Sequence, residues 1–141
     1  MKETISTAVG FAAGLLSWLV GGFDTPVLAL VVCMAVDYVT GLLVAGVFHS
    51  SPKTASGGLD SRVGWKGLAR KFVTMLMVMV ANLADALLGQ CCIRDAAVVG
   101  FCANECISIL ENAGHMGIRI PKGLRQALEH LNQEESDHDG A

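Results

Sequence analysis

Four long apolar runs occupy more than half of this chain of 141 residues. They cover residues 5–23, 27–48, 72–89 and 96–113. In a helix, most of these runs reach about 26–30 Å, which is close to the thickness of the hydrocarbon layer of a membrane. Because few soluble domains contain several runs of this length, the pattern predicts an all-α membrane protein with about four transmembrane helices.

The composition also favours a membrane protein. Charged residues make up 16% of the chain and hydrophobic residues 52%, with a mean hydropathy of +0.52, whereas soluble proteins average about 25% charged residues. The net charge is only −3, and the basic residues lie in a few segments beside apolar runs, so nothing indicates nucleic-acid binding. The first run leads through a short turn into the second, which indicates a helical hairpin and not a cleavable signal peptide.

The distribution of Lys and Arg predicts the orientation in the membrane. With four spans, both termini and the predicted loop at residues 49–71 lie on one side, and that side holds every basic residue except Arg94. We therefore expect both termini in the cytoplasm. Residues 5–23 are rich in Gly and Ala, and an alternative with three spans leaves this segment on the membrane surface or outside the bilayer.

Two groups of basic residues are expected at the membrane surface. One lies where the chain enters the third span and the other follows the fourth span; they are Lys66, Arg70 and Lys71, and Arg119, Lys122 and Arg125. Leu124, Leu128 and Leu131 are spaced at i, i+4 and i+7, which predicts an amphipathic helix over residues 121–132. The acidic residues 133–141 are expected to be disordered.

Acidic and amide side chains lie inside three of the predicted spans, and such residues are functional candidates in membrane proteins. The second span contains Asp37, and Gly41 continues the same helical face as part of a row of small residues. The other candidates for intramembrane contacts or oligomerisation are Asn82, Asp85, Asn104, Glu105, Ser108, Glu111 and Asn112. No Lys or Arg falls inside a predicted span, so we expect these acids to have no cationic partner in the membrane.

An ionised acid at the centre of the bilayer costs about 2.5–3.5 kcal/mol on insertion scales. Three arrangements lower that cost: the acids are protonated, they form hydrogen bonds across helices, or they face water. The acids then either hold one monomer together or line an oligomeric interface or an aqueous lesion. The residues alone leave both interpretations open.

No pattern predicts a catalytic residue, a metal site or a cofactor. Cys91 and Cys92 lack a second pair of metal ligands. Cys102 and Cys106 share a helical face that contains no His, which favours a packing role. The Ser and Cys residues have no constellation of His and Asp around them, so we expect a protein that is not an enzyme.

Several segments, taken in order, resemble the toxin-secretion/phage-lysis holins, which are small membrane proteins of phages and prophages. They are DYVTG at 37–41, SRVGWKGLARK at 61–71, Asp85, NECISILEN at 104–112 and GIRIPKGL at 117–124. Each segment alone is a weak signal, but their order and spacing together are specific. The resemblance covers residues 37 to 131. This chain departs from many holins in its acidic C-terminal tail, where they have a basic one.

The resemblance implies a single transmembrane domain over residues 1–132, in the bacterial cytoplasmic membrane. Its partners would be the lipid bilayer and other copies of itself. It would form homo-oligomers and open lesions that release an endolysin or a toxin and so lyse the host cell, without stable contact with that cargo. Two rivals remain: a small proton-coupled four-helix transporter, and an accessory subunit of a larger membrane complex.

Overall fold

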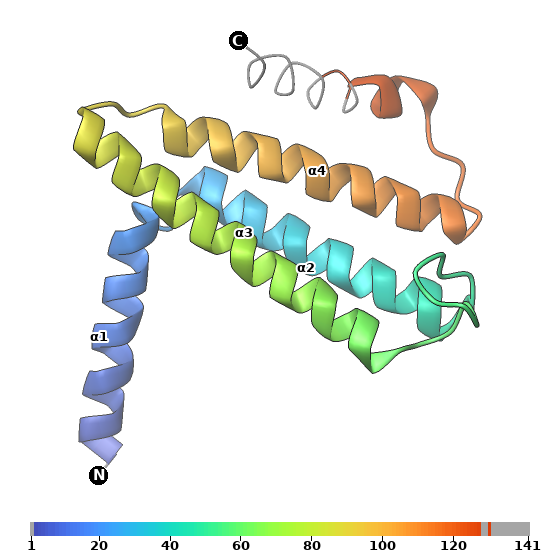
Figure 1. Ribbon diagram of the computed structural model, residues 1–141, viewed down its shortest axis with the longest axis horizontal. Helices are drawn as coiled ribbons and strands as arrows, with labels where there is room; N and C mark the ends of the chain where they lie inside the picture. The colour runs from blue at the N-terminus through green and yellow to red at the C-terminus, as the bar shows by residue number, and fades with distance from the viewer. Residues whose placement is uncertain (1, 128–129, 131–141) are drawn as a thin grey trace.

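The structure, a computed structural model, describes residues 2–127 and 130, and in this part of the chain it contains helices and no strands. The four long helices are α1 (Lys2–Val20), α2 (Thr25–Gly46), α3 (Ser61–Leu88) and α4 (Ile93–His115). Figure 1 shows α2, α3 and α4 running alongside one another, whereas α1 leaves them at a large angle. The predicted all-α class is confirmed.

The core of the three-helix bundle is small and apolar. Leu30 and Met34 of α2 pack with Val78 of α3 and Val98 of α4, and Val20 and Val27 complete the cluster at one end. Most other large apolar side chains point away from the bundle; Phe72, Leu87 and Val99 are examples. A bundle with a thin core and an apolar exterior is suited to a lipid environment.

Three of the helices, α1, α2 and α3, are long and apolar enough to cross a membrane. The helix α4 is not among them; it contains Arg94, Asp95, Glu105 and Glu111. The predicted fourth span is therefore a helix at the expected place, but its crossing of the membrane stays a prediction. Only the C-terminal end of α1 is buried, at Val20.

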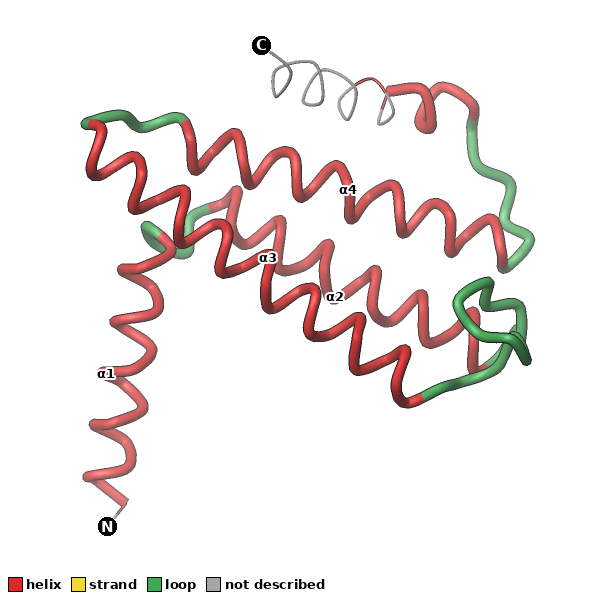
Figure 2. Tube along the Cα trace, in the orientation of Figure 1, coloured by secondary structure: helices red, strands yellow, loops and turns green. Residues whose placement is uncertain are grey.

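Local capping explains where α2 and α3 begin. Asp24 precedes α2 and its carboxylate accepts a hydrogen bond from the Val27 amide at 3.3 Å, with Pro26 in the first turn. Asp60 precedes α3 and accepts one from the Arg62 amide at 2.8 Å. Such side-chain acceptors satisfy free amides at helix starts. Figure 2 shows the long loop that joins these two helices.

The helix α3 starts earlier than the predicted third span, which begins at residue 72. Residues 61–71 of the predicted loop are therefore helical, whereas residues 49–60 are not. Asp60 caps α3, and the glycines Gly64 and Gly67 let its first turns approach Tyr38 of α2. At about 42 Å, a helix of this length exceeds the hydrocarbon thickness, so it either tilts or extends beyond the membrane.

The chain after α4 is described only in part. Residues 122–127 are helical and exposed, which fits the beginning of the predicted amphipathic helix. Leu128, Leu131 and the acidic residues 133–141 lie outside the described residues, so the rest of that helix and the disordered tail stay predictions.

Candidate functional site

A buried group of charged side chains joins the three helices of the bundle. The Lys71 Nζ atom of α3 lies 2.7 Å from an Asp37 carboxylate oxygen of α2 and 2.5 Å from a Glu105 carboxylate oxygen of α4. The three side chains are only 12%, 15% and 14% exposed. One ammonium group therefore donates hydrogen bonds to both acids.

The expectation that these acids lack a cationic partner is wrong. Lys71 was expected at the membrane surface, but it lies on α3 and points into the bundle. The prediction failed because hydropathy placed the start of the third span one residue after Lys71, which is where the apolar run begins. The helix itself continues through the lysine and carries it to the level of Asp37 and Glu105.

Asn112 of α4 completes this group. Its amide donates to the Asp37 carboxylate at 3.1 Å and to the Thr40 hydroxyl oxygen at 3.0 Å. Gly41 lies beside this amide, because a Cβ built there would be 3.7 Å from the Asn112 Nδ2 atom. We call Asp37, Lys71, Glu105 and Asn112 the ionic cluster. The predicted polar faces of α2 and α4 thus meet inside one chain.

The ionic cluster lies near the middle of the bundle. Asp37 and Glu105 are each twelve residues from the first residue of their helix, or about 18 Å along the axis. Two carboxylates and one ammonium carry a formal net charge of minus one. Charged groups at this depth need close partners, because the loss of hydration costs several kcal/mol per ion.

A second polar group lies at the end of the bundle where the two short turns meet. The buried Asp85 accepts hydrogen bonds from the Ile93 amide at 3.0 Å and the Arg94 amide at 2.9 Å. Both amides belong to the first turn of α4, whose own preceding residue, Cys92, gives it no side-chain cap. Asp85 therefore caps α4 from the end of α3.

Arg94 and Asn82 attach the first hairpin to this end. Arg94 donates to the Val20 carbonyl at 2.8 Å and pairs with Asp24 at 2.7 Å. Asn82 donates to the Leu19 carbonyl at 3.0 Å. The hydrogen bond from Arg94 is the main reason that the pKa of Asp24 lies below its ordinary value. We call Asp24, Asn82, Asp85 and Arg94 the turn cluster.

The remaining predicted residues lie outside both clusters. Ser108 is half-buried on α4, whereas Asn104 and Glu111 are exposed on the same helix. The basic side chains expected at the membrane surface, apart from Lys71, are exposed, as the surface assignment requires; they are Lys66, Arg70, Arg119, Lys122 and Arg125. Their contact with a membrane stays a prediction.

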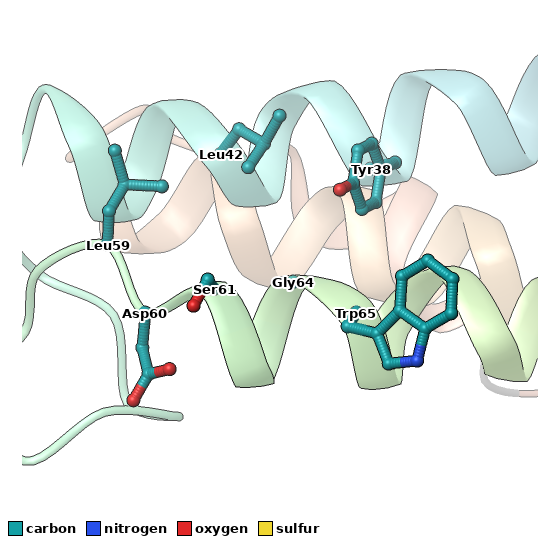
Figure 3. A pocket seen from close by; sticks show the side chains of 7 residues that line it. All are labelled: Tyr38, Leu42, Leu59, Asp60, Ser61, Gly64 and Trp65. Atoms are coloured by element: carbon teal, nitrogen blue, oxygen red, sulfur yellow. The ribbon is translucent and has the colours of Figure 1, made fainter.

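An open groove of about 590 Å³ lies between the second half of α2 and the start of α3. Figure 3 shows the aromatic side chains of Tyr38 and Trp65 in its lining, with Leu42, Leu59 and Asp60. The carboxylate of Asp60 already caps α3. The residues that line the groove show no catalytic arrangement. No group of side chains suited to a metal ion occurs within residues 2–127 and 130.

Comparison with known proteins finds a family and relatives that this chain resembles. The model of the bacteriophage holin family matches residues 14–133. An uncharacterized protein of Halalkalibacterium halodurans is 36% identical over 142 residues, covering 96% of this chain and 99% of that protein. A probable holin of Bacillus phage phi105 is 32% identical over 111 residues, covering 78% of this chain and 74% of its own. No solved structure matches this chain.

These matches confirm the resemblance that the sequence motifs indicated. The family and the three apolar helices together indicate a membrane protein, and the family indicates one that is not an enzyme. The chain belongs to the bacteriophage holin family.

Proposed function

We propose that this chain is a holin of a phage or prophage. It accumulates in the bacterial cytoplasmic membrane, oligomerises and opens lesions through which an endolysin or a toxin leaves the cell. The family match supports this function. The observation that supports a mechanism for this function is the ionic cluster, which places charged groups inside a bundle with a thin apolar core.

The ionic cluster would hold the bundle closed until assembly. In the closed chain, Lys71 partners both acids, and Asn112 supplies a further hydrogen bond to Asp37. In a water-lined assembly, the same charged groups would recover hydration and no longer need one another. The balance between these two arrangements would set how readily α2 and α4 separate.

The charge of the ionic cluster also links this balance to the membrane potential. A charge that crosses the whole membrane changes in energy by about 2.3 kcal/mol per 100 mV. A net charge of minus one that starts near mid-depth would feel about half of that, or about 1 kcal/mol per 100 mV. If opening moves this negative charge toward the cytoplasmic face, which a negative interior opposes, a collapse of the potential would shift the cluster toward the open arrangement.

The test is to induce the chain in bacteria, alone and together with an endolysin, and to follow a membrane-potential dye and culture turbidity. A holin alone should abruptly abolish the potential and stop growth, and with the endolysin the culture should lyse. Drug resistance with intact growth would favour the transporter. A full-length chain that accumulates in the membrane without any effect would favour the accessory subunit.

A further inference from the structure

Three thiol groups meet where α2 packs against α4. Cys33 belongs to α2, Cys102 and Cys106 belong to α4, and all three are half-buried free cysteines. The sulfur atoms of Cys33 and Cys106 are 3.9 Å apart. Cys102 also lies close to Cys33. The sequence assigned Cys102 and Cys106 a packing role, and neither cluster described above uses these thiols.

The position of the thiols connects them to the ionic cluster. Cys33 precedes Asp37 by one helical turn, and Cys106 follows Glu105 directly. The sulfur contact and the ionic cluster therefore bridge the same pair of helices at neighbouring levels. A covalent bond at the sulfur contact would fix α2 against α4 regardless of the state of the ionic cluster.

We propose that Cys33 and Cys106 are a redox-sensitive pair whose disulfide locks α2 to α4. A disulfide has an S–S length of about 2.05 Å, so the two sulfurs, which lie 3.9 Å apart, must approach by about 2 Å. Cys33 must supply the α2 sulfur of any such disulfide, because α2 contains no other cysteine. Under reducing conditions the pair stays as thiols, and oxidative conditions form the bond.

The oxidation balances as a two-electron step. The two thiols lose two protons and two electrons as the S–S bond forms. A diazene oxidant such as diamide accepts both electrons and both protons and becomes a hydrazine. Excess dithiothreitol reverses the step, because its own thiols take over the disulfide by exchange.

The first experiment tests the bond itself. Membranes containing the full chain are treated with diamide, digested without reduction and analysed by mass spectrometry. We expect a cross-linked peptide pair containing Cys33 and Cys106, lighter by two hydrogen atoms than the separate peptides and lost on addition of dithiothreitol. The Cys33→Ala variant should lose this cross-link.

The matched control removes the exposed thiols of the turn before α4. A double variant, Cys91→Ala with Cys92→Ala, should retain the cross-link between Cys33 and Cys106. The proposal is overturned if diamide joins no cysteine of α2 to α4, or if Cys33 is joined to Cys102 instead of Cys106. This assay does not depend on lysis, so it gives an answer even if the chain opens no lesions.

The second experiment tests the lock and rests on the proposed function. Opening a lesion would require α2 and α4 to separate, so diamide should delay loss of the membrane potential in cells expressing the wild-type chain. Dithiothreitol should restore the timing, and Cys33→Ala should show no delay at the same diamide dose. Equal delays for the wild type and Cys33→Ala, with the cross-link present, would overturn the lock.

Discussion

Each carboxylate at the middle of the bundle accepts a hydrogen bond from the same ammonium group, that of Lys71. Removal of one member of a buried ion pair typically costs about 3–5 kcal/mol, because the other member stays buried without its partner. The loss of Lys71 would leave two buried acids without a cationic partner. The loss of one acid would still leave Lys71 paired with the other, so the variants should differ in severity.

The Lys71→Met variant should therefore lose about 3–5 kcal/mol of stability. Asp37→Asn should lose less, because the pair of Lys71 and Glu105 survives. Thermal unfolding in detergent, monitored by circular dichroism, measures both. Lys66→Met is the matched control, since it removes the same charge from an exposed position on the same helix. Equal unfolding temperatures for Lys71→Met and Lys66→Met would contradict the buried cluster.

Gly21 shows a second constraint at the scale of one residue. Its φ is +81°, and a Cβ there would collide with the Asn82 side chain, whereas Gly22 has a φ of +98° and open space around it. Ala at either site meets the backbone strain of positive φ, but only Gly21→Ala also displaces the turn cluster. Gly21→Ala should therefore unfold at a lower temperature than Gly22→Ala, and the reverse order would contradict the close approach of Asn82.

Among the helices, α3 shows most clearly which features of the fold the sequence could predict and which it could not. Apolar runs located all four helices, because burial in lipid requires long apolar segments. The start of α3 was missed, because basic residues and glycines interrupt the apolar residues in the turns that follow the cap at Asp60. That boundary error also concealed the partner of Asp37 and Glu105. The acids themselves were predicted, because charges are rare inside apolar runs.

The first turn of α4 is capped by Asp85, a residue of the preceding helix. Loss of a capping side chain typically costs about 0.5–2 kcal/mol and exposes the first turn. Asp85→Ala should thus accelerate amide hydrogen exchange at Ile93 and Arg94. Asp95→Ala, at an exposed position of the same turn, should leave these rates nearly unchanged. Unaltered exchange in Asp85→Ala would show that the cap does not hold α4.

At the scale of the whole molecule, the position of α1 is the part of the topology that most needs a test. Figure 1 shows α1 leaving the bundle at a large angle, so the first predicted span does not pack along the others. The sequence could not predict this arrangement, because an apolar run specifies a helix but not the surface against which it packs. The four-span topology with both termini in the cytoplasm stays our proposal.

Cysteine labelling of intact cells with an impermeant maleimide tests that topology. The exposed Cys91 and Cys92 should react from outside. In a background without these two thiols, cysteines introduced as Ser56→Cys and Ser6→Cys should both be protected, because the four-span topology places them in the cytoplasm. Labelling of Ser6→Cys alone would indicate three spans, and labelling of Ser56→Cys would reverse the orientation.

The most direct test of the central claim, that the ionic cluster holds a holin closed, is the time at which cells lose membrane potential at equal membrane abundance of each variant. Lys71→Met weakens the closed bundle and should advance that time. The triple variant Lys71→Met, Asp37→Asn and Glu105→Gln leaves no buried charge to hydrate in the open assembly, and it should delay potential loss. Lys53→Met, which removes an exposed charge from the loop between α2 and α3, should match the wild type. If Lys71→Met and the triple variant both lose potential at the wild-type time, the ionic cluster does not control opening.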